Sequence, residues 1–90
     1  MVLSDKDIIE KVFKNRCPKC RRLAATIHEL EPRSRGKASL KLQNRTAIDR
    51  ECHEEYHRLG ASDKRIAEWE EYIEKYLRSI GTWELYVENQ

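Results

Sequence analysis

Hydrophobic residues recur at helical spacing near the start of the chain. Ser4 is a residue type suited to a helix N-cap, and acidic residues follow it directly, where the helix dipole favours them. The apolar positions after it share one helical face: Ile8, Ile9, Val12 and Phe13. This pattern predicts a short helix from about residue 5 to 14.

Helical spacing returns in the second half of the chain. Cys52, Tyr56 and Leu59 predict a short helix that starts near residue 51 and stops near Gly60. Ser62 then caps a longer helix of about residues 62–80 that ends at Gly81. The apolar face of this longer helix carries Ile66, Trp69, Ile73, Tyr76, Leu77 and Ile80.

Between residue 17 and about residue 50 the helical pattern is absent. Pro18, Pro32 and Gly36 mark turns and loops in this segment. Two short apolar stretches, Leu23–Ile27 and the residues near Leu40–Leu42, predict a two-stranded ribbon, which is not stable alone. The tail, Thr82–Gln90, is expected to be extended and to pack back on the body through Trp83, Leu85 and Tyr86.

The elements together indicate one small α+β domain over residues 1–90, with its core at about residues 15–60. Charged residues make up 38% of the chain and hydrophobic residues 39%, so the apolar core is thin and a metal, disulfide or partner is expected to stabilise it. Three cysteines are an odd number, which argues against a disulfide framework and favours a reducing, cytoplasmic compartment. The sequence predicts neither a membrane span nor a signal peptide.

Charge is strongly segregated along the chain. Residues 14–50 carry eleven Lys and Arg against three Asp and Glu, whereas residues 51–90 carry five basic against ten acidic residues. A basic segment in a protein with a net charge of +2 is typical of a surface that meets a polyanion such as DNA. A solvated face of lysines and arginines is the alternative.

The most specific local motif is Cys17-Pro-Lys-Cys20. Two thiolates separated by two residues can reach one Zn²⁺ at roughly 2.3 Å. A redox C-x-x-C is the competing interpretation, but it expects a βαβ setting that the sequence does not indicate. Cys52 supplies a third thiol. The fourth ligand stays open at this point among Asp49, His53 and His57.

The chain has three histidines, and two of them stand four residues apart. His53 and His57 therefore project from one face of the predicted helix and can bind one cation together. Their position directly after a cysteine that is a candidate zinc ligand favours a metal-binding role over a surface or core role. His28 lies at the end of the first apolar stretch of the ribbon.

These motifs, in this order, resemble a known family. The segments are Cys17-Pro-Lys-Cys20, Ile27-His-Glu-Leu-Glu-Pro-Arg-Ser-Arg-Gly36, Asn44 and Cys52-His-Glu-Glu-Tyr-His57. Residues 17–57 resemble the HNH endonucleases, in particular the small phage and bacterial forms with a zinc-bound ββα-metal, or treble-clef, core. The resemblance implies hydrolysis of DNA phosphodiester bonds with a structural Zn²⁺ and a catalytic divalent cation such as Mg²⁺, Mn²⁺ or Ni²⁺.

The resemblance also implies roles for individual residues. His28, His53 and His57 would hold the catalytic cation, and Asn44 would brace the metal-binding loop. Cys17, Cys20 and Cys52 would bind the structural zinc, with Asp49 where a fourth cysteine is usual. Contact with DNA is expected from the basic residues of the same segment: Arg33, Arg35, Lys37, Lys41 and Arg45.

Glu29 is the main departure from the family pattern. It stands where the family usually has the histidine that deprotonates the attacking water, and a carboxylate is the weaker base, with an unperturbed pKa of about 4.3. Glu29 would then act as a substitute base or as an extra metal ligand. Two alternatives stay open: a non-catalytic zinc module that binds nucleic acid or protein through the basic segment, and a structural zinc protein whose acidic C-terminal helix docks a partner.

Overall fold

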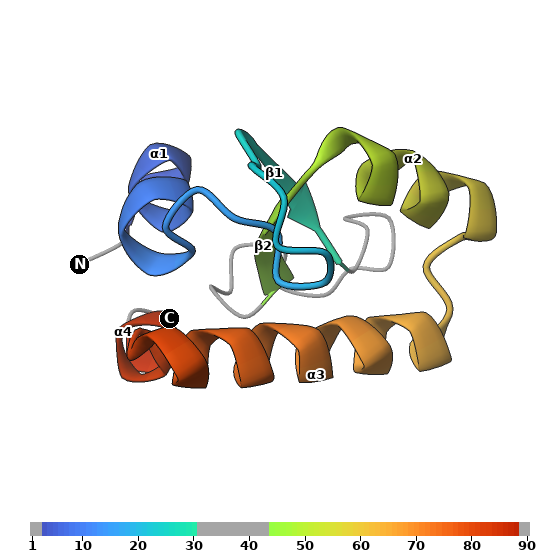
Figure 1. Cartoon of the computed structure of the whole chain (residues 1–90). Helices are drawn as coiled ribbons and strands as arrows, with labels where there is room; N and C mark the ends of the chain where they lie inside the picture. The colour runs from blue at the N-terminus through green and yellow to red at the C-terminus, as the bar shows by residue number, and fades with distance from the viewer. Residues whose placement is uncertain (1–2, 31–43, 89–90) are drawn as a thin grey trace.

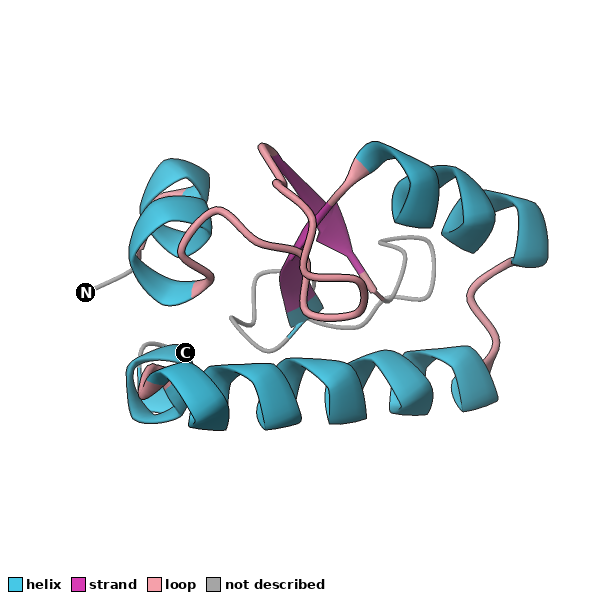
Figure 2. Cartoon of the chain, in the orientation of Figure 1, coloured by secondary structure: helices cyan, strands magenta, loops and turns pink. Residues whose placement is uncertain are grey.

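A computed structural model of the chain describes residues 3–30 and 44–88. Two antiparallel strands lie at the centre, and helices surround them (Figures 1 and 2). The α+β class predicted from the sequence is confirmed. The elements, in chain order, are α1 (Asp5–Asp7), η1 (Ile8–Val12), β1 (Thr26–Glu29), β2 (Arg45–Ile48), α2 (Arg50–Leu59), α3 (Asp63–Ile80) and α4 (Trp83–Glu88).

The predicted N-terminal helix is present as α1 and the π-helical turn η1 that continues it. Ser4 is the N-cap, and its Oγ accepts a hydrogen bond of 3.1 Å from the backbone N–H of Asp7. The helix ends slightly earlier than predicted because Lys14 and Asn15 have left-handed backbone conformations, with φ of 56° and 61°. Ile8 and Val12 are fully buried on the inner face.

The predicted ribbon exists, but only part of it lies where the sequence placed it. β1 pairs antiparallel with β2, with Thr26 opposite Ile48 and Glu29 opposite Arg45. The prediction of a strand within Leu23–Ile27 is therefore right only for its last two residues. The second predicted stretch, Leu40–Leu42, lies outside the described residues, and the partner strand is 45–48. Three successive buried residues in β2 hide the alternation that would have indicated a strand.

Both helices predicted in the second half are confirmed. α2 ends at Gly60, and Ser62 caps α3 by accepting a 3.2 Å hydrogen bond from the N–H of Arg65. Gly81 ends α3 in a left-handed conformation with φ of 80°, which a glycine adopts without steric cost. The buried face of α3 carries Trp69, Ile73, Tyr76 and Leu77, four of the six residues predicted for it.

The tail was expected to be extended, and that expectation is wrong, because residues 83–88 form α4. The left-handed Gly81 reverses the chain, so the next turn packs against η1 (Figure 1). Tyr86 is 1% exposed, its ring meets Phe13 edge-on, and its hydroxyl donates a 2.9 Å hydrogen bond to the carbonyl of Arg45. Leu85 remains exposed, contrary to the expectation that it packs inward.

Side-chain hydroxyls of α3 and of the turn that follows it hold the end of the N-terminal helix. The Tyr76 hydroxyl donates to the carbonyl of Phe13 at 2.7 Å, and the Thr82 hydroxyl donates to that of Val12 at 2.7 Å. Both donors are buried, so these bonds replace water at carbonyls that a helix terminus leaves unsatisfied. Among the helices in the described part of the chain, none is long and apolar enough to cross a membrane.

We expect Thr82→Val to lower the free energy of unfolding by about 1–3 kcal/mol, because it leaves the Val12 carbonyl buried without this donor. Denaturant unfolding measures the change. Thr26→Val is the matched control, since the Thr26 hydroxyl also donates to a carbonyl, that of Ile48, but the residue is exposed and water can replace it. Equal destabilisation by the two substitutions would contradict this role for Thr82.

Candidate functional site

The turn that contains Cys17 and Cys20 brings the two thiols to one side of the chain. The N–H of Cys17 donates to the carbonyl of Arg22 at 2.9 Å, and the N–H of Arg21 donates to the carbonyl of Cys17 at 2.8 Å. Arg21 has a left-handed conformation with φ of 66°, which closes the turn. Its guanidinium lies 4.5 Å from the centre of the Tyr76 ring, so the turn is also fixed to α3.

Asp49 and Cys52 complete a cluster of four potential ligands. Asp49 is the N-cap of α2, and Cys52 lies in its first turn, three residues later. The ligand atoms of Cys17, Cys20, Asp49 and Cys52, which we call the cysteine–aspartate cluster, all lie within 4.8 Å of one another. Cys17, Asp49 and Cys52 are buried, and the Cys20 Sγ donates to Asp49 Oδ1 at 3.0 Å.

This arrangement could hold a zinc ion. Ligands at about 2.3 Å from tetrahedral zinc lie about 3.8 Å apart, and the ligand atoms of the cluster lie on either side of that separation, from 3.0 Å between Cys20 Sγ and Asp49 Oδ1 up to a limit of 4.8 Å. Three sulfur atoms and one carboxylate oxygen form a closed set of four donors, which is typical of a structural site. Of the three candidates for the fourth ligand, the structure places Asp49 with the cysteines and groups His53 and His57 elsewhere.

The four groups interact strongly with one another. Burial favours a higher pKa for Asp49, but hydrogen bonds from the thiols of Cys52, Cys20 and Cys17 outweigh it and hold its pKa at about 2. Burial, followed by the Asp49 carboxylate, raises the pKa of the Cys52 thiol, and burial does the same for Cys20. Cys20 and Cys52 therefore need a cation to become thiolates at neutral pH, and binding of a cation would release their protons.

The three histidines form a second cluster. His28 comes from β1, and His53 and His57 come from successive turns of α2; their ligand atoms also lie within 4.8 Å of one another. The Nε2 atoms of His53 and His57 are 2.9 Å apart. Nε2 of His28 is buried and has no hydrogen-bond partner among the described residues. A buried ring nitrogen without a partner is costly unless something binds it.

Burial and neighbouring imidazoles keep two residues of this histidine cluster in the neutral form. Burial, and then the neighbouring His53 and His57, lowers the pKa of His28 to about 4. Burial and His57 also lower the pKa of His53. These two imidazoles are therefore neutral near pH 7, which is the form that binds a metal ion. The pair predicted from spacing, His53 and His57, thus lies together with His28, which the family resemblance added.

A groove of about 480 Å³ lies beside the histidine cluster. His28, Glu29, Tyr56 and His57 contribute to its walls. Glu29 follows His28 on β1. Among the described residues, its carboxylate belongs to neither the cysteine–aspartate cluster nor the histidine cluster. Asn44 lies just before β2, and its carbonyl accepts a 2.8 Å hydrogen bond from the N–H of Leu30. This bond extends the pairing of the two strands by one residue.

The basic residues predicted to contact DNA fall into two groups. Arg45 is described, and its side chain is only 11% exposed and pairs with Asp5 at 3.0 Å. This placement commits the guanidinium to a carboxylate of the same chain and does not favour contact with DNA. The other four lie outside the described residues: Arg33, Arg35, Lys37 and Lys41.

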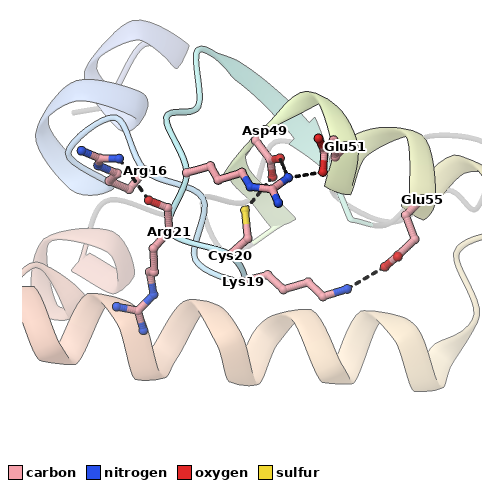
Figure 3. Close-up of polar contacts among 8 residues, drawn as sticks. Arg16, Lys19, Cys20, Arg21, Asp49, Glu51 and Glu55 are labelled. Carbon is pink, nitrogen blue, oxygen red and sulfur yellow. Dashed lines mark hydrogen bonds and ion pairs between the residues drawn. The ribbon is translucent and has the colours of Figure 1, made fainter.

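Two features of the site were missed at the level of sequence. The Tyr56 ring packs on His28, with 4.4 Å between ring centres, and its hydroxyl donates to the carbonyl of Leu30 at 2.7 Å. Lys19, inside the cysteine turn, forms a 2.6 Å ion pair with Glu55 of α2 (Figure 3). The position of Tyr56 one turn after Cys52 indicated burial, whereas nothing in the sequence indicated the pairing across 36 residues.

No protein-family model, curated protein or solved structure matches the chain. The resemblance to HNH endonucleases therefore depends on the motif residues alone, and the function has to be inferred from the two clusters.

We expect Asp49→Ala to weaken zinc binding by more than the roughly 10- to 100-fold typical of losing a residue that only hydrogen-bonds to a ligand. The reason is that Asp49 is one of four donors. His57→Ala is the control and should keep about one zinc ion per chain. Metal analysis after dialysis against a chelator of moderate affinity measures both. Loss of zinc in His57→Ala but not in Asp49→Ala would move the fourth ligand to His57.

Proposed function

We propose that the chain is a metal-dependent DNA endonuclease of the HNH type with a structural zinc ion. The observation that carries this proposal is the histidine cluster, in which three imidazoles from a strand and a helix converge while the buried Nε2 of His28 has no partner among the described residues. A bound cation requires such convergence of ring nitrogens. Histidines that are merely solvated, or packed in a core, do not require it.

The order of the elements supports a treble-clef core. The cysteine turn comes first, two antiparallel strands follow, and α2 then supplies both the second half of the cysteine–aspartate cluster and two histidines. This is the order that the ββα-metal arrangement expects. We infer that the cysteine–aspartate cluster fixes the start of α2 and so places His53 and His57 opposite β1.

The residues around the histidine cluster have distinct proposed roles. His28, His53 and His57 would hold a divalent cation, which when bound polarises the scissile phosphate and stabilises the charge that develops there. Glu29, in the wall of the adjacent groove, would accept the proton of the attacking water. Asn44 would brace the end of the sheet. Arg33 and Arg35 are proposed from the motif to position the DNA backbone.

The donor set favours one kind of cation. Among the described residues, the cluster offers three imidazole nitrogens and no carboxylate oxygen. Imidazole suits zinc, copper, iron and nickel, whereas Mg²⁺ and Mn²⁺ prefer oxygen ligands. Of the three catalytic cations that the family resemblance implies, Ni²⁺ therefore fits this site best.

DNA is the proposed substrate because of the basic segment. Residues 14–50 have an excess of eight positive charges. Binding of DNA to this segment would release counterions from the DNA, and this release would increase the affinity. Arg45 is left out of the proposed contacts because it is bound to Asp5. The proposed contacts are those from Arg33, Arg35, Lys37 and Lys41.

One observation favours a second candidate, a non-catalytic zinc module that binds nucleic acid or a protein partner. A glutamate replaces the usual base histidine, and its carboxylate lies outside the histidine cluster. Such a module would retain the cysteine–aspartate cluster and the basic segment but would not cleave DNA.

We expect the full chain to nick supercoiled plasmid DNA, faster with Ni²⁺ than with Mg²⁺, and His53→Ala to lower the initial rate at least about 100-fold, because it removes a cation ligand. Agarose-gel assays of the initial nicking rate measure this. Glu54→Ala is the control, since Glu54 is exposed on the same helix and pairs with Arg50. If the chain binds DNA but does not nick it in the presence of any of the cations, the non-catalytic module is favoured.

We expect Glu29→His to raise the nicking rate, because an imidazole with a pKa near neutrality is a better proton acceptor than a carboxylate. Glu29→Ala should lower the rate, by up to the roughly 10²–10⁴-fold that a positioned base contributes, without abolishing it. Initial rates at fixed pH and cation concentration compare the three proteins. An inactive Glu29→Ala together with an unimproved Glu29→His would show that the carboxylate is essential in itself.

A further inference from the structure

The two carboxylate oxygens of Asp49 face different partners. Oδ1 accepts a hydrogen bond from the Cys20 thiol at 3.0 Å, inside the cysteine–aspartate cluster. Oδ2 lies 3.9 Å from Nη1 of Arg22. The Asp49 side chain is 6% exposed, and the thiols of Cys52 and Cys17 also hydrogen-bond to its carboxylate. Oδ1 thus faces the thiol of Cys20, while Oδ2 is the oxygen within ion-pair distance of a guanidinium.

Arg22 is itself held in place by a second carboxylate. Its Nη1 forms an ion pair and hydrogen bond with Oε2 of Glu51, which lies in the first turn of α2. Figure 3 shows Asp49 and Glu51 close together at the start of α2, with Cys20 next to Asp49. The guanidinium therefore bridges two carboxylates that stand two residues apart, from a position two residues after Cys20.

A carboxylate in this cluster has one problem that a cysteine would not have. It can bind a cation through one oxygen or through both, and binding through both would add a fifth donor to a closed tetrahedral set. A second problem would be the same with four cysteines: four anionic ligands leave a Zn²⁺ site with two net negative charges in a largely buried place. A positive group near the outer oxygen reduces both problems.

We propose that Arg22 is a positioning residue for the metal of the cysteine–aspartate cluster, holding Oδ2 of Asp49 so that the carboxylate binds the cation through Oδ1 alone. This inference depends on the proposed zinc site and not on nuclease activity. Partners that hydrogen-bond to a metal ligand change metal affinity by roughly 10- to 100-fold. The contact between Arg22 and Asp49 is a 3.9 Å ion pair and not a hydrogen bond, and Arg22 is 59% exposed, so solvent weakens the pairing and the effect reaches at most the lower end of that range.

The test uses Co²⁺ in place of Zn²⁺ in the full chain, because thiolate-bound Co²⁺ absorbs visible light and reports the number and type of its ligands. Arg22→Gln should weaken Co²⁺ binding about tenfold and shift the ligand-field bands. Arg50→Gln is the matched control: it removes an arginine beside Asp49, but its side chain is 91% exposed and pairs with Glu54. The control should leave affinity and spectrum unchanged, and Arg22→Lys should recover part of the affinity.

A second pair of proteins isolates the contact with Oδ2. In the background of Asp49→Cys, which has no second oxygen, Arg22→Gln should change Co²⁺ affinity less than about twofold, because the effect is transmitted through the carboxylate. An equal loss in both backgrounds, or an unchanged spectrum in Arg22→Gln, would overturn the role of Arg22 and leave the metal site intact. Absence of thiolate-to-cobalt absorption in the unsubstituted chain would overturn the metal site as well.

Discussion

The convergence of four potential ligand side chains from two separate segments is the constraint on which the proposed site depends. Cys17 and Cys20 lie on a turn without regular structure, and Asp49 and Cys52 lie at the start of a ten-residue helix. We expect neither segment to be stable alone, because so short a helix is marginal in water and the sheet has two strands in the part of the chain that the structure describes. A cation bound between them would add to the small apolar core of a chain in which 38% of the residues are charged.

The same junction determines the geometry of the histidine cluster. His53 directly follows Cys52, so any displacement of the first turn of α2 moves an imidazole away from His28. Tyr56 supports the histidine cluster, because its ring contacts His28 on one side and Trp69 of α3 on the other. The ion pair between Lys19 and Glu55 adds a further link between the turn and the helix. The proposed chemistry therefore depends on packing that lies outside the ligand set.

Much of this structure follows from local signals in the sequence. Helices begin or end where residue preferences predict, at Ser4, Gly60, Ser62 and Gly81. Spacing also indicates the three cysteines, His53 and His57 as candidate ligands, whereas it leaves Asp49 as one of three alternatives, and only the family resemblance implies His28. What could not be predicted depends on contacts between distant segments. β2 is a strand because it pairs with β1, and the 83–88 segment is a helix because Tyr86 packs against Phe13. The pairing of Arg45 is likewise a contact between distant segments, because its partner Asp5 lies 40 residues away.

The hydrogen bonds at the end of η1 have a consequence for how the molecule folds. Thr82 binds the carbonyl of Val12 and Tyr76 that of Phe13, across sequence separations of 70 and 63 residues. Contacts between residues so far apart in the sequence form late in folding. The chain loses the entropy of closing a long loop before these contacts stabilise the native state. Both candidate metal clusters, by contrast, lie within residues 17–57. Metal capture can therefore precede docking of the N-terminal helix, and the metal-bound segment can serve as the nucleus on which the two ends of the described chain later close.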